Sequence, residues 1–217
     1  MLCRGLEESD MTSQGGTEAA EVSEAPDIIR EVHHQVKNSL QVVCSLLRLE
    51  GRGVTDLATH ELIRRSEARV QAMALVYDTL YKTGSFLEVP LDRYVRSLTE
   101  QVVRGWRGAG QNVVVEYSLE AVSISAKAAV SCGLILNEVL SGIRPNSSAT
   151  VLRVREQVFH GGIALDLDTD EPSRDRAEND QLSSQIVQAL AQQYGGRVLS
   201  QFSEYAHYRV ELPSIAA

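Results

Sequence analysis

The chain has 217 residues, of which 43% are hydrophobic, so it is long enough for one large or two small domains with real cores. Its net charge is −8, and it shows no basic face that would attract nucleic acid. The sequence contains no apolar run long enough to span a membrane and no signal-peptide core at its start, so we expect a cytoplasmic protein without membrane contact.

Residues 1–26 are predicted to form a disordered acidic tail. Glycine, serine, threonine, glutamate and alanine dominate this segment, and large apolar residues are almost absent. Such a composition cannot bury enough surface to offset the entropy that is lost on ordering.

The three cysteines, Cys3, Cys44 and Cys132, are too few and too scattered for a disulfide framework or a zinc site. Cys44 and Cys132 stand among apolar residues of predicted helices. We expect both to be small buried thiols without a catalytic role.

Residues 27–85 are predicted to form a helical hairpin. From residue 28 to about residue 50, apolar residues recur at steps of three and four along one helical face. A glycine-rich turn follows, and Thr55 or Asp56 can cap a second helix that runs to about Lys82. Two long helices with so short a connection pack in antiparallel fashion.

A single hairpin of this kind leaves apolar surface exposed to water. The stripe on the first helix consists of Ile29, Val32, Val36, Leu40, Val43 and Leu47. Two hairpins related by a two-fold axis would bury such stripes in a four-helix bundle. We therefore predict a homodimer.

Residues 86–217 are predicted to form a two-layer α/β sandwich, which makes the fold class of the whole chain α+β. Helical periodicity and apolar alternation mark the elements. The expected helices are 91–106, 126–143 and 182–194, and the expected strands are 112–119, 150–158, 162–168, 196–203 and 207–213. Helices and strands mixed over this length are typical of a helix layer packed on a sheet.

The sequence REVHHQVKNSLQVV, residues 30–43, places two histidines side by side in an amphipathic helix. At about 100° per residue, His33 lies within roughly 60° of the centre of the apolar stripe, and His34 lies roughly 160° away. We therefore expect His33 to pack or hydrogen-bond and His34 to point outward. Because adjacent helical residues diverge, the pair is poorly suited to binding a metal.

An outward-facing neutral imidazole is a competent nucleophile near pH 7. Toward a phosphoryl group it needs little more than position, because charge and alignment stabilise the transition state. Lys37 could supply a cation, and Asn38, one turn along the helix, could orient the ring of His34. On these residues alone, however, a solvated polar face is the commoner explanation. His60, His160 and His207 have no neighbours that suggest chemistry, and we expect them to be structural or solvated.

The stretch EVHHQVKNSLQVVCSLLRLE (31–50) closely resembles the subgroup-2 dimerisation and phosphoacceptor domain of bacterial histidine kinases, which is related to the HWE kinases. That family's pattern is roughly E-[IV]-H-H-R-V-K-N-N-L-Q-x-[IV]-x-S-L-L-x-L-Q. RVQAMALVYDTLY (69–81) resembles the second helix of the same domain. GLILNEVLSGI (133–143) resembles the start of the family's ATP-binding domain.

The resemblance implies that His34 is the phosphoacceptor, with Lys37 and Asn38 beside it. Two local departures, Gln35 where the family usually has arginine and Tyr77 where it usually has histidine, leave the acceptor in place. The side chains that we expect to contact a receiver domain are Arg30, Gln41 and Ser45.

The ATP-binding half departs from the family pattern where nucleotide would bind. By the resemblance, any residual nucleotide site would consist of Asn137, Glu138 and Asp166. Gly142 stands where the family has an asparagine that helps to hold magnesium. Asp168 and Asp170 replace glycines that let backbone N–H groups approach the triphosphate, and they add negative charge there. We therefore expect a degenerate ATPase-like domain of the GHKL (Bergerat) fold that has lost ATP binding.

These features together predict a histidine phosphotransferase of a two-component phosphorelay, which passes a phosphoryl group between receiver aspartates through His34. The architecture is similar to that of the ChpT-type and sporulation-type phosphotransferases, although the motif comes from a different kinase subgroup. One alternative is an active soluble histidine kinase that phosphorylates His34 from ATP. Another is a non-catalytic dimeric adaptor for response regulators, although an adaptor has no need of an outward-facing His34.

The expected partners are receiver domains of response regulators, an upstream hybrid or sensor histidine kinase, and a second copy of the chain. We expect the chain to bind no cofactor and no metal of its own. Magnesium would be supplied by the receiver, and ATP with magnesium would be needed only by a kinase.

Overall fold

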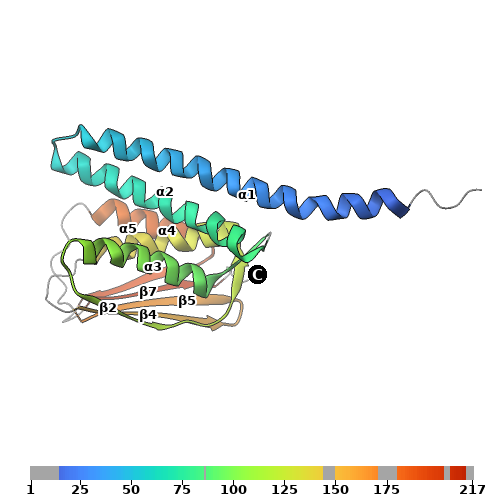
Figure 1. Cartoon of the computed structure of the whole chain (residues 1–217). Helices are drawn as coiled ribbons and strands as arrows, with labels where there is room; N and C mark the ends of the chain where they lie inside the picture. Colours follow the sequence, from blue (N-terminus) through green and yellow to red (C-terminus); the bar gives the residue numbers. More distant parts are fainter. Residues whose placement is uncertain (1–14, 86, 144–149, 171–179, 203–205, 214–217) are drawn as a thin grey trace, which may run out of the picture.

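The computed structural model of the chain describes residues 15–85, 87–143, 150–170, 180–202 and 206–213. Two antiparallel helices, α1 (Gly15–Arg52) and α2 (Leu57–Thr83), form the predicted hairpin, and the N-terminal part of α1 extends past the rest of the molecule (Figure 1). Among the helices described, none combines the length and the apolar character that a membrane span needs.

The α1 helix begins earlier than the sequence predicts. The expectation of a disordered tail over residues 1–26 was wrong from Gly15 onward, because the structure places residues 15–26 in α1. Alanine and glutamate are frequent between residues 17 and 24, and both are strong helix formers that continue a helix already nucleated by the hairpin. Residues 1–14 lie outside the described residues.

The ends of α2 follow their sequence signals. Asp56 is the N-cap, and its carboxylate accepts a hydrogen bond of 2.8 Å from the backbone N–H of Thr59. At the other end Gly84 adopts φ 65°, the left-handed conformation that a glycine provides most readily after a helix. The predicted choice between Thr55 and Asp56 is thus resolved in favour of Asp56.

The second part of the chain is an α/β two-layer sandwich, as predicted. Its sheet has the order β2-β4-β5-β7-β6, in which β2 runs parallel to β4 and the other pairs are antiparallel. The helices α3, α4 and α5 form the layer that covers one face of this sheet (Figure 1). The helices are α3 (Leu91–Gly108), α4 (Ala126–Gly142) and α5 (Asp180–Gln192), and the strands are β2 (Val113–Ser118), β4 (Thr150–Phe159), β5 (Gly162–Thr169), β6 (Arg197–Phe202) and β7 (Ala206–Leu212).

Two short strands were missed by the sequence prediction. β1 (Glu88–Pro90) and β3 (Ser123–Ser125) pair in antiparallel fashion beside the N-termini of α3 and α4. Three residues are too few for an alternating pattern to stand out from the surrounding loop.

One hydrophobic core joins the hairpin to the second part of the chain. Ala72, Val76 and Leu80 on α2 are fully buried and belong to the same cluster as the core residues of α3, α4 and the sheet. The sequence prediction sets a domain boundary between residues 85 and 86, and the packed interior crosses this position. The hairpin and the sandwich therefore share apolar surface that would be exposed if they separated.

Tyr94 crosses this shared core. Its side chain is fully buried, and its hydroxyl donates a hydrogen bond of 2.9 Å to the backbone oxygen of Ala72 on α2. To reach that oxygen, the ring passes directly over Gly133 of α4, where a Cβ atom would lie only 1.6 Å from the Tyr94 hydroxyl. A glycine at position 133 is therefore what allows α3 to be fastened to α2.

Glu156 is an unusual member of the interior. Its side chain on β4 is 2% exposed, and neither carboxylate oxygen has a hydrogen-bond partner among the described residues. The pKa of this carboxyl is raised to about 8, mainly by burial and further by the negative charges of Asp92 and Glu120. The folded protein thus retains a proton on Glu156 at neutral pH.

Replacing Gly133 by alanine should destabilise the fold by about 2 kcal/mol or more, because Tyr94 must leave its position or lose its bond to Ala72. Urea denaturation measures this change. Gly105→Ala is the matched control, because nothing lies within 4 Å of a Cβ at this position in α3, and alanine there should add roughly 0.5–1 kcal/mol of helix stability. Equal effects of both substitutions would contradict the role given to Gly133.

Glu156→Gln should change the pH dependence of stability. Between about pH 4.5 and pH 8 the unfolded chain has lost the Glu156 proton that the folded chain retains, so the free energy of unfolding falls as pH rises. The glutamine variant lacks this penalty. Its free energy of unfolding should exceed that of wild type by roughly a few kcal/mol near pH 8 and should match it near pH 4. The urea midpoints of both proteins are measured from pH 4 to pH 8. A constant difference between them over this range would contradict the raised pKa of Glu156.

Candidate functional site

His34 lies on α1 where it faces the C-terminal part of α2. Its ring centroid is 5.5 Å from that of Tyr81, with the two planes inclined by 34°. His34 is therefore half-buried, not fully exposed as the helical wheel suggests, because Tyr81 covers one side of the ring. The other side remains open to a partner.

Asn38 stands one turn from His34, as predicted. Its Nδ2 atom is 3.5 Å from Nε2 of His34, which is the long end of hydrogen-bond distance. This contact is loose enough to break when another group approaches the ring, while it still biases the ring's orientation. The arrangement fits the orienting role that the sequence suggests for Asn38.

Lys37 is less free than the sequence suggests. Its Nζ atom lies 2.6 Å from Asp78 of α2, and the other oxygen of Asp78 lies 2.6 Å from Lys82. Burial by itself would raise the pKa of the Asp78 carboxyl, but the hydrogen bonds from Lys37 and Lys82 hold it below its ordinary value. The three groups carry a net positive charge one turn away from His34.

His33 behaves as the wheel predicts. It is half-buried against α2, with its ring centroid 6.0 Å from that of Tyr77, and burial lowers its pKa. The neighbouring histidines therefore have different surroundings, and His33 serves as a natural comparison for any chemistry assigned to His34.

An open groove of about 710 Å³ begins near Lys37 and follows α2 away from His34. The floor is α2, and the walls are α1 on one side and α3 on the other, in agreement with the order of the three helices in Figure 1. We call it the α1–α2–α3 groove. Its lining residues are Lys37, Gln41, Cys44, Ser45, Arg48, Gln71, Ala74, Leu75, Asp78, Lys82, Gln101 and Arg104.

The three residues predicted to contact a receiver are split by the structure. Gln41 and Ser45 line the groove together with Lys37. Arg30 lies on the other side of His34, near Gly84 at the end of α2, and is not among the groove residues. A partner that contacts all three would have to cover His34 from both sides.

Glu138 and Asn137 lie on α4 and are almost fully buried, at 4% and 2% exposure. Arg69 of α2 donates two hydrogen bonds to the Glu138 carboxylate, from Nε at 2.7 Å and from Nη2 at 3.1 Å. This bidentate ion pair occupies both oxygens of the carboxylate that aligns with the family's phosphate-proximal glutamate. Arg69 and Glu138 are 69 residues apart, so no local pattern could have revealed the pair.

Asp166 does not join Asn137 and Glu138, and the predicted grouping of the three residues is wrong in this respect. On β5, Leu165 and Leu167 point into the core beneath the helix layer, so Asp166 between them points to the opposite face of the sheet. There its carboxylate accepts hydrogen bonds of 2.9 and 3.1 Å from Nη1 of Arg209 and lies 3.2 Å from Nε2 of His207.

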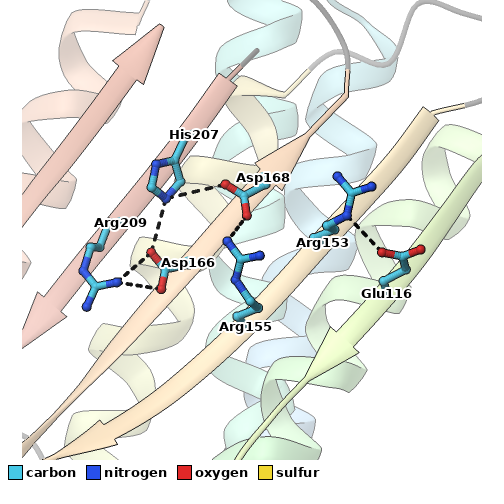
Figure 2. Close-up of polar contacts among 7 residues, drawn as sticks. All are labelled: Glu116, Arg153, Arg155, Asp166, Asp168, His207 and Arg209. Atoms are coloured by element: carbon cyan, nitrogen blue, oxygen red, sulfur yellow. Dashed lines mark hydrogen bonds and ion pairs between the residues drawn. The ribbon is translucent and has the colours of Figure 1, made fainter. Parts of the chain in front are cut away.

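The aspartates that replace the family's glycines have structural partners. Asp168 is paired with Arg155, and its other oxygen lies 3.5 Å from His207. Asp170 accepts a hydrogen bond of 2.7 Å from the backbone N–H of Val151. Figure 2 shows the ion pairs of Asp166 and Asp168 and the Glu116–Arg153 pair running across the face of the sheet, with the helices behind the strands.

His207 thus lies beside Asp166 and Asp168, which agrees with the structural alternative of the prediction, although the sequence did not reveal these partners. Alternation along β7 could have placed His207 and Arg209 on one face, but not opposite Asp166.

Elsewhere, Cys44 and Cys132 are buried free thiols, as predicted. Within the described ranges, no group of three or more histidine, cysteine or acidic side chains is arranged to hold a metal ion.

Comparison with known proteins relates the chain to histidine kinases. Residues 31–106 match the family model HisKA_2, described as histidine kinase. The sensor histidine kinase PdtaS of Mycolicibacterium smegmatis is 45% identical over 67 residues, and that of Mycobacterium tuberculosis (strain H37Rv) is 48% identical over 52 residues. The matched stretches make up 31% and 24% of this chain but only 13% and 10% of those relatives.

Solved structures share the fold across nearly the whole chain. The histidine kinase domain of the blue-light activated histidine kinase EL346 from Erythrobacter litoralis superposes with a TM-score of 0.58 at 21% identity, covering 89% of this chain and 94% of that domain. A longer EL346 structure gives a TM-score of 0.57 at 21% identity, over 92% of this chain and 64% of that one. Residues 31–106 are therefore similar to the HisKA_2 family, and the chain shares the α+β fold of these solved kinase domains.

Replacing Arg69 by methionine should destabilise the protein by about 3–5 kcal/mol, because the buried Glu138 carboxylate loses its bidentate cation. The double variant Arg69→Met/Glu138→Gln removes the charge as well and should recover a large part of this loss. Urea denaturation of wild type, both single variants and the double variant measures the coupling energy between the two side chains. If Arg69→Met and the double variant were equally stable, the unpaired carboxylate of Glu138 would carry no penalty. The loss in both variants would then come from the arginine side chain alone.

Proposed function

We propose that the chain is a histidine phosphotransferase of a two-component phosphorelay, in which His34 carries the phosphoryl group between receiver aspartates. The observation that carries the proposal is the position of Glu138. It is buried and held by Arg69, and Arg69 precedes Tyr81 by 12 residues, or about 18 Å along α2. Tyr81 in turn covers His34. A nucleotide beside Glu138 would thus be far from the acceptor.

The proposed reaction needs only the surroundings of His34. A ring nitrogen with a free lone pair attacks the phosphorus of a receiver's phosphoaspartate in line, forming an N–P bond as the P–O bond to the aspartate breaks and frees its carboxylate. The receiver supplies the magnesium that offsets phosphate charge. In the second half, the aspartate of another receiver attacks the phosphohistidine, and the imidazole leaves. Lys37 and Lys82 provide positive charge nearby, and Asn38 biases the ring.

The second part of the chain supports this proposal over ATP-driven phosphorylation. The Asp166 carboxylate, which aligns with the family's adenine contact, faces away from the helix layer and is paired with Arg209. Asp168 and Asp170 are held in contacts with neighbouring strands, where glycines would leave backbone N–H groups accessible to phosphate. Gly142 supplies no side chain for magnesium.

An active histidine kinase is the second candidate, because residues 31–106 match a family model described as histidine kinase and the similar curated proteins are named sensor histidine kinases. That activity would require the Arg69–Glu138 pair to open and the shared core around Tyr94 to separate. A non-catalytic adaptor for response regulators would keep the partner surface and make no use of the His34 ring.

We further propose that the phosphotransferase works as a homodimer in the cytoplasm, with receiver domains and an upstream hybrid or sensor kinase as its partners. Val32, Val43 and Leu46 on α1 are 49%, 42% and 54% exposed in the single chain, and Leu62 on α2 is 51% exposed. A second hairpin would bury these side chains in a four-helix bundle. By the helical wheel, Gln41 lies about 160° from Val43, so the groove stays open in such a dimer.

Transfer to His34 is tested with receiver domains phosphorylated by radiolabelled acetyl phosphate in magnesium, and in parallel with radiolabelled ATP and magnesium. We expect a phosphorylated receiver to label wild type and the matched control His33→Ala, and to leave His34→Ala unlabelled. ATP should label none of the three proteins, because the nucleotide half lacks its magnesium ligand and phosphate-binding glycines.

The three candidate functions give different results in this assay. Labelling of wild type, but not of His34→Ala, by ATP would reject the phosphotransferase in favour of a kinase. Receivers that bind the chain without labelling it would identify an adaptor. Loss of labelling in His33→Ala alone would move the acceptor to the neighbouring histidine.

A further inference from the structure

The third wall of the groove comes from the second part of the chain. Gln101 and Arg104 lie on α3, one turn apart, and both line the α1–α2–α3 groove. Gln101 donates a hydrogen bond of 2.7 Å to Gln71 on the groove floor, which closes the seam between α2 and α3. Arg104 is exposed and has no ion-pair partner within the described part of the chain. Its guanidinium is free to meet a carboxylate.

The position of α3 relative to His34 is fixed by buried contacts. Tyr94 on α3 is bonded to the backbone of α2, and α4 beside it is held by the Arg69–Glu138 pair. The core between these helices is continuous. Whatever docks over His34 therefore meets α3 at a set distance and orientation, as it would in a single domain.

The charge of the groove is opposite to that of the chain. Four cationic side chains, Lys37, Arg48, Lys82 and Arg104, line the groove. Lys37 and Lys82 share Asp78, and Arg48 is paired with Glu67, so the groove keeps two positive charges in excess, while the whole chain has a net charge of −8. A positive groove on an acidic protein favours an acidic partner and steers its approach. A phosphorylated aspartate among the carboxylates that bind a receiver's magnesium is such a partner.

The length of the groove agrees with the size of a receiver domain. Lys37 and Arg48 are three and fourteen residues beyond His34, so the groove runs from about 5 to about 21 Å along α1. A domain of 100–150 residues has a radius of gyration of about 13–15 Å. A receiver seated with its aspartate at His34 is therefore wide enough to reach the far end of the groove, where Arg48 and Arg104 lie.

We propose that Arg104 on α3 contacts the docked receiver and contributes to partner choice, with Gln101 and Gln71 holding the groove floor in place. This inference rests on the proposed phosphotransfer through His34. It assigns the second part of the chain a direct role in receiver recognition. Arg104 touches neither the phosphate nor His34, and its effect is on binding alone.

The experiment compares Arg104→Gln with Arg153→Gln. Both remove one positive charge, but Arg153 is half-buried and lies on the opposite face of the sheet, paired with Glu116. The donor is whichever acetyl-phosphate-labelled receiver phosphorylates wild type most rapidly. Single-turnover rates are measured against receiver concentration at two or more salt concentrations.

We expect Arg104→Gln to raise the receiver concentration for half-maximal rate three- to tenfold, leave the maximal rate unchanged and weaken the salt dependence, because one cation of the groove is lost. Arg153→Gln should match wild type in all three. Identical behaviour of the two variants, with transfer still dependent on His34, would overturn the role of Arg104 alone. A lower maximal rate at unchanged half-saturation would also overturn it. If no receiver labels His34, the proposed function and this inference both fail.

Discussion

The ion pair between Arg69 and Glu138 joins the α1–α2 hairpin to the α/β sandwich, and much of the structure depends on it. A buried ion pair is weak evidence for net stability, because the desolvation of both groups offsets their attraction. Its effect here is on geometry, since a bidentate guanidinium–carboxylate contact tolerates little rotation. Together with Tyr94, which crosses Gly133 to reach α2, the pair sets one orientation of the sandwich on the hairpin.

This orientation and the alternation of side chains along β5 together explain why Glu138 and Asp166 are not gathered into one site. Glu138 faces the hairpin, and Asp166 faces the far side of the sheet, where Arg209 pairs with it and Arg155 pairs with its neighbour Asp168. Carboxylates that are paired in this way add to the rigidity of the sheet.

Much of the fold follows from local signals in the sequence. The hairpin, the cap at Asp56 and the three helices and five strands of the sandwich each have a clear period or breaker residue. Apart from the start of α1, the expected positions agree with the structure to within a few residues. The helical start at Gly15 was missed because low hydrophobicity was read as disorder, although alanine and glutamate favour a helix that is already nucleated.

The site was only partly predictable, for two different reasons. The outward direction of His34 followed from the 100° step, but its cover by Tyr81 and the pairing of Lys37 with Asp78 depend on how two helices face each other. Contacts such as Arg69–Glu138 join distant segments and leave no periodic signal. The face of Asp166, by contrast, was encoded: it alternates with Leu165 and Leu167, and the strand parity conflicted with the motif alignment that placed it in a nucleotide site.

A phosphoryl carrier and a kinase place opposite demands on such an architecture. A kinase must bring a bound nucleotide to the histidine and then withdraw, so its two parts must separate and meet again. A carrier receives each partner at the same open surface and benefits from a partner-binding wall that does not move. The shared core, the bond from Tyr94 to Ala72 and the occupied Glu138 carboxylate meet the second demand. For the proposed carrier, the sandwich would serve as a fixed support for the wall that α3 adds to the groove.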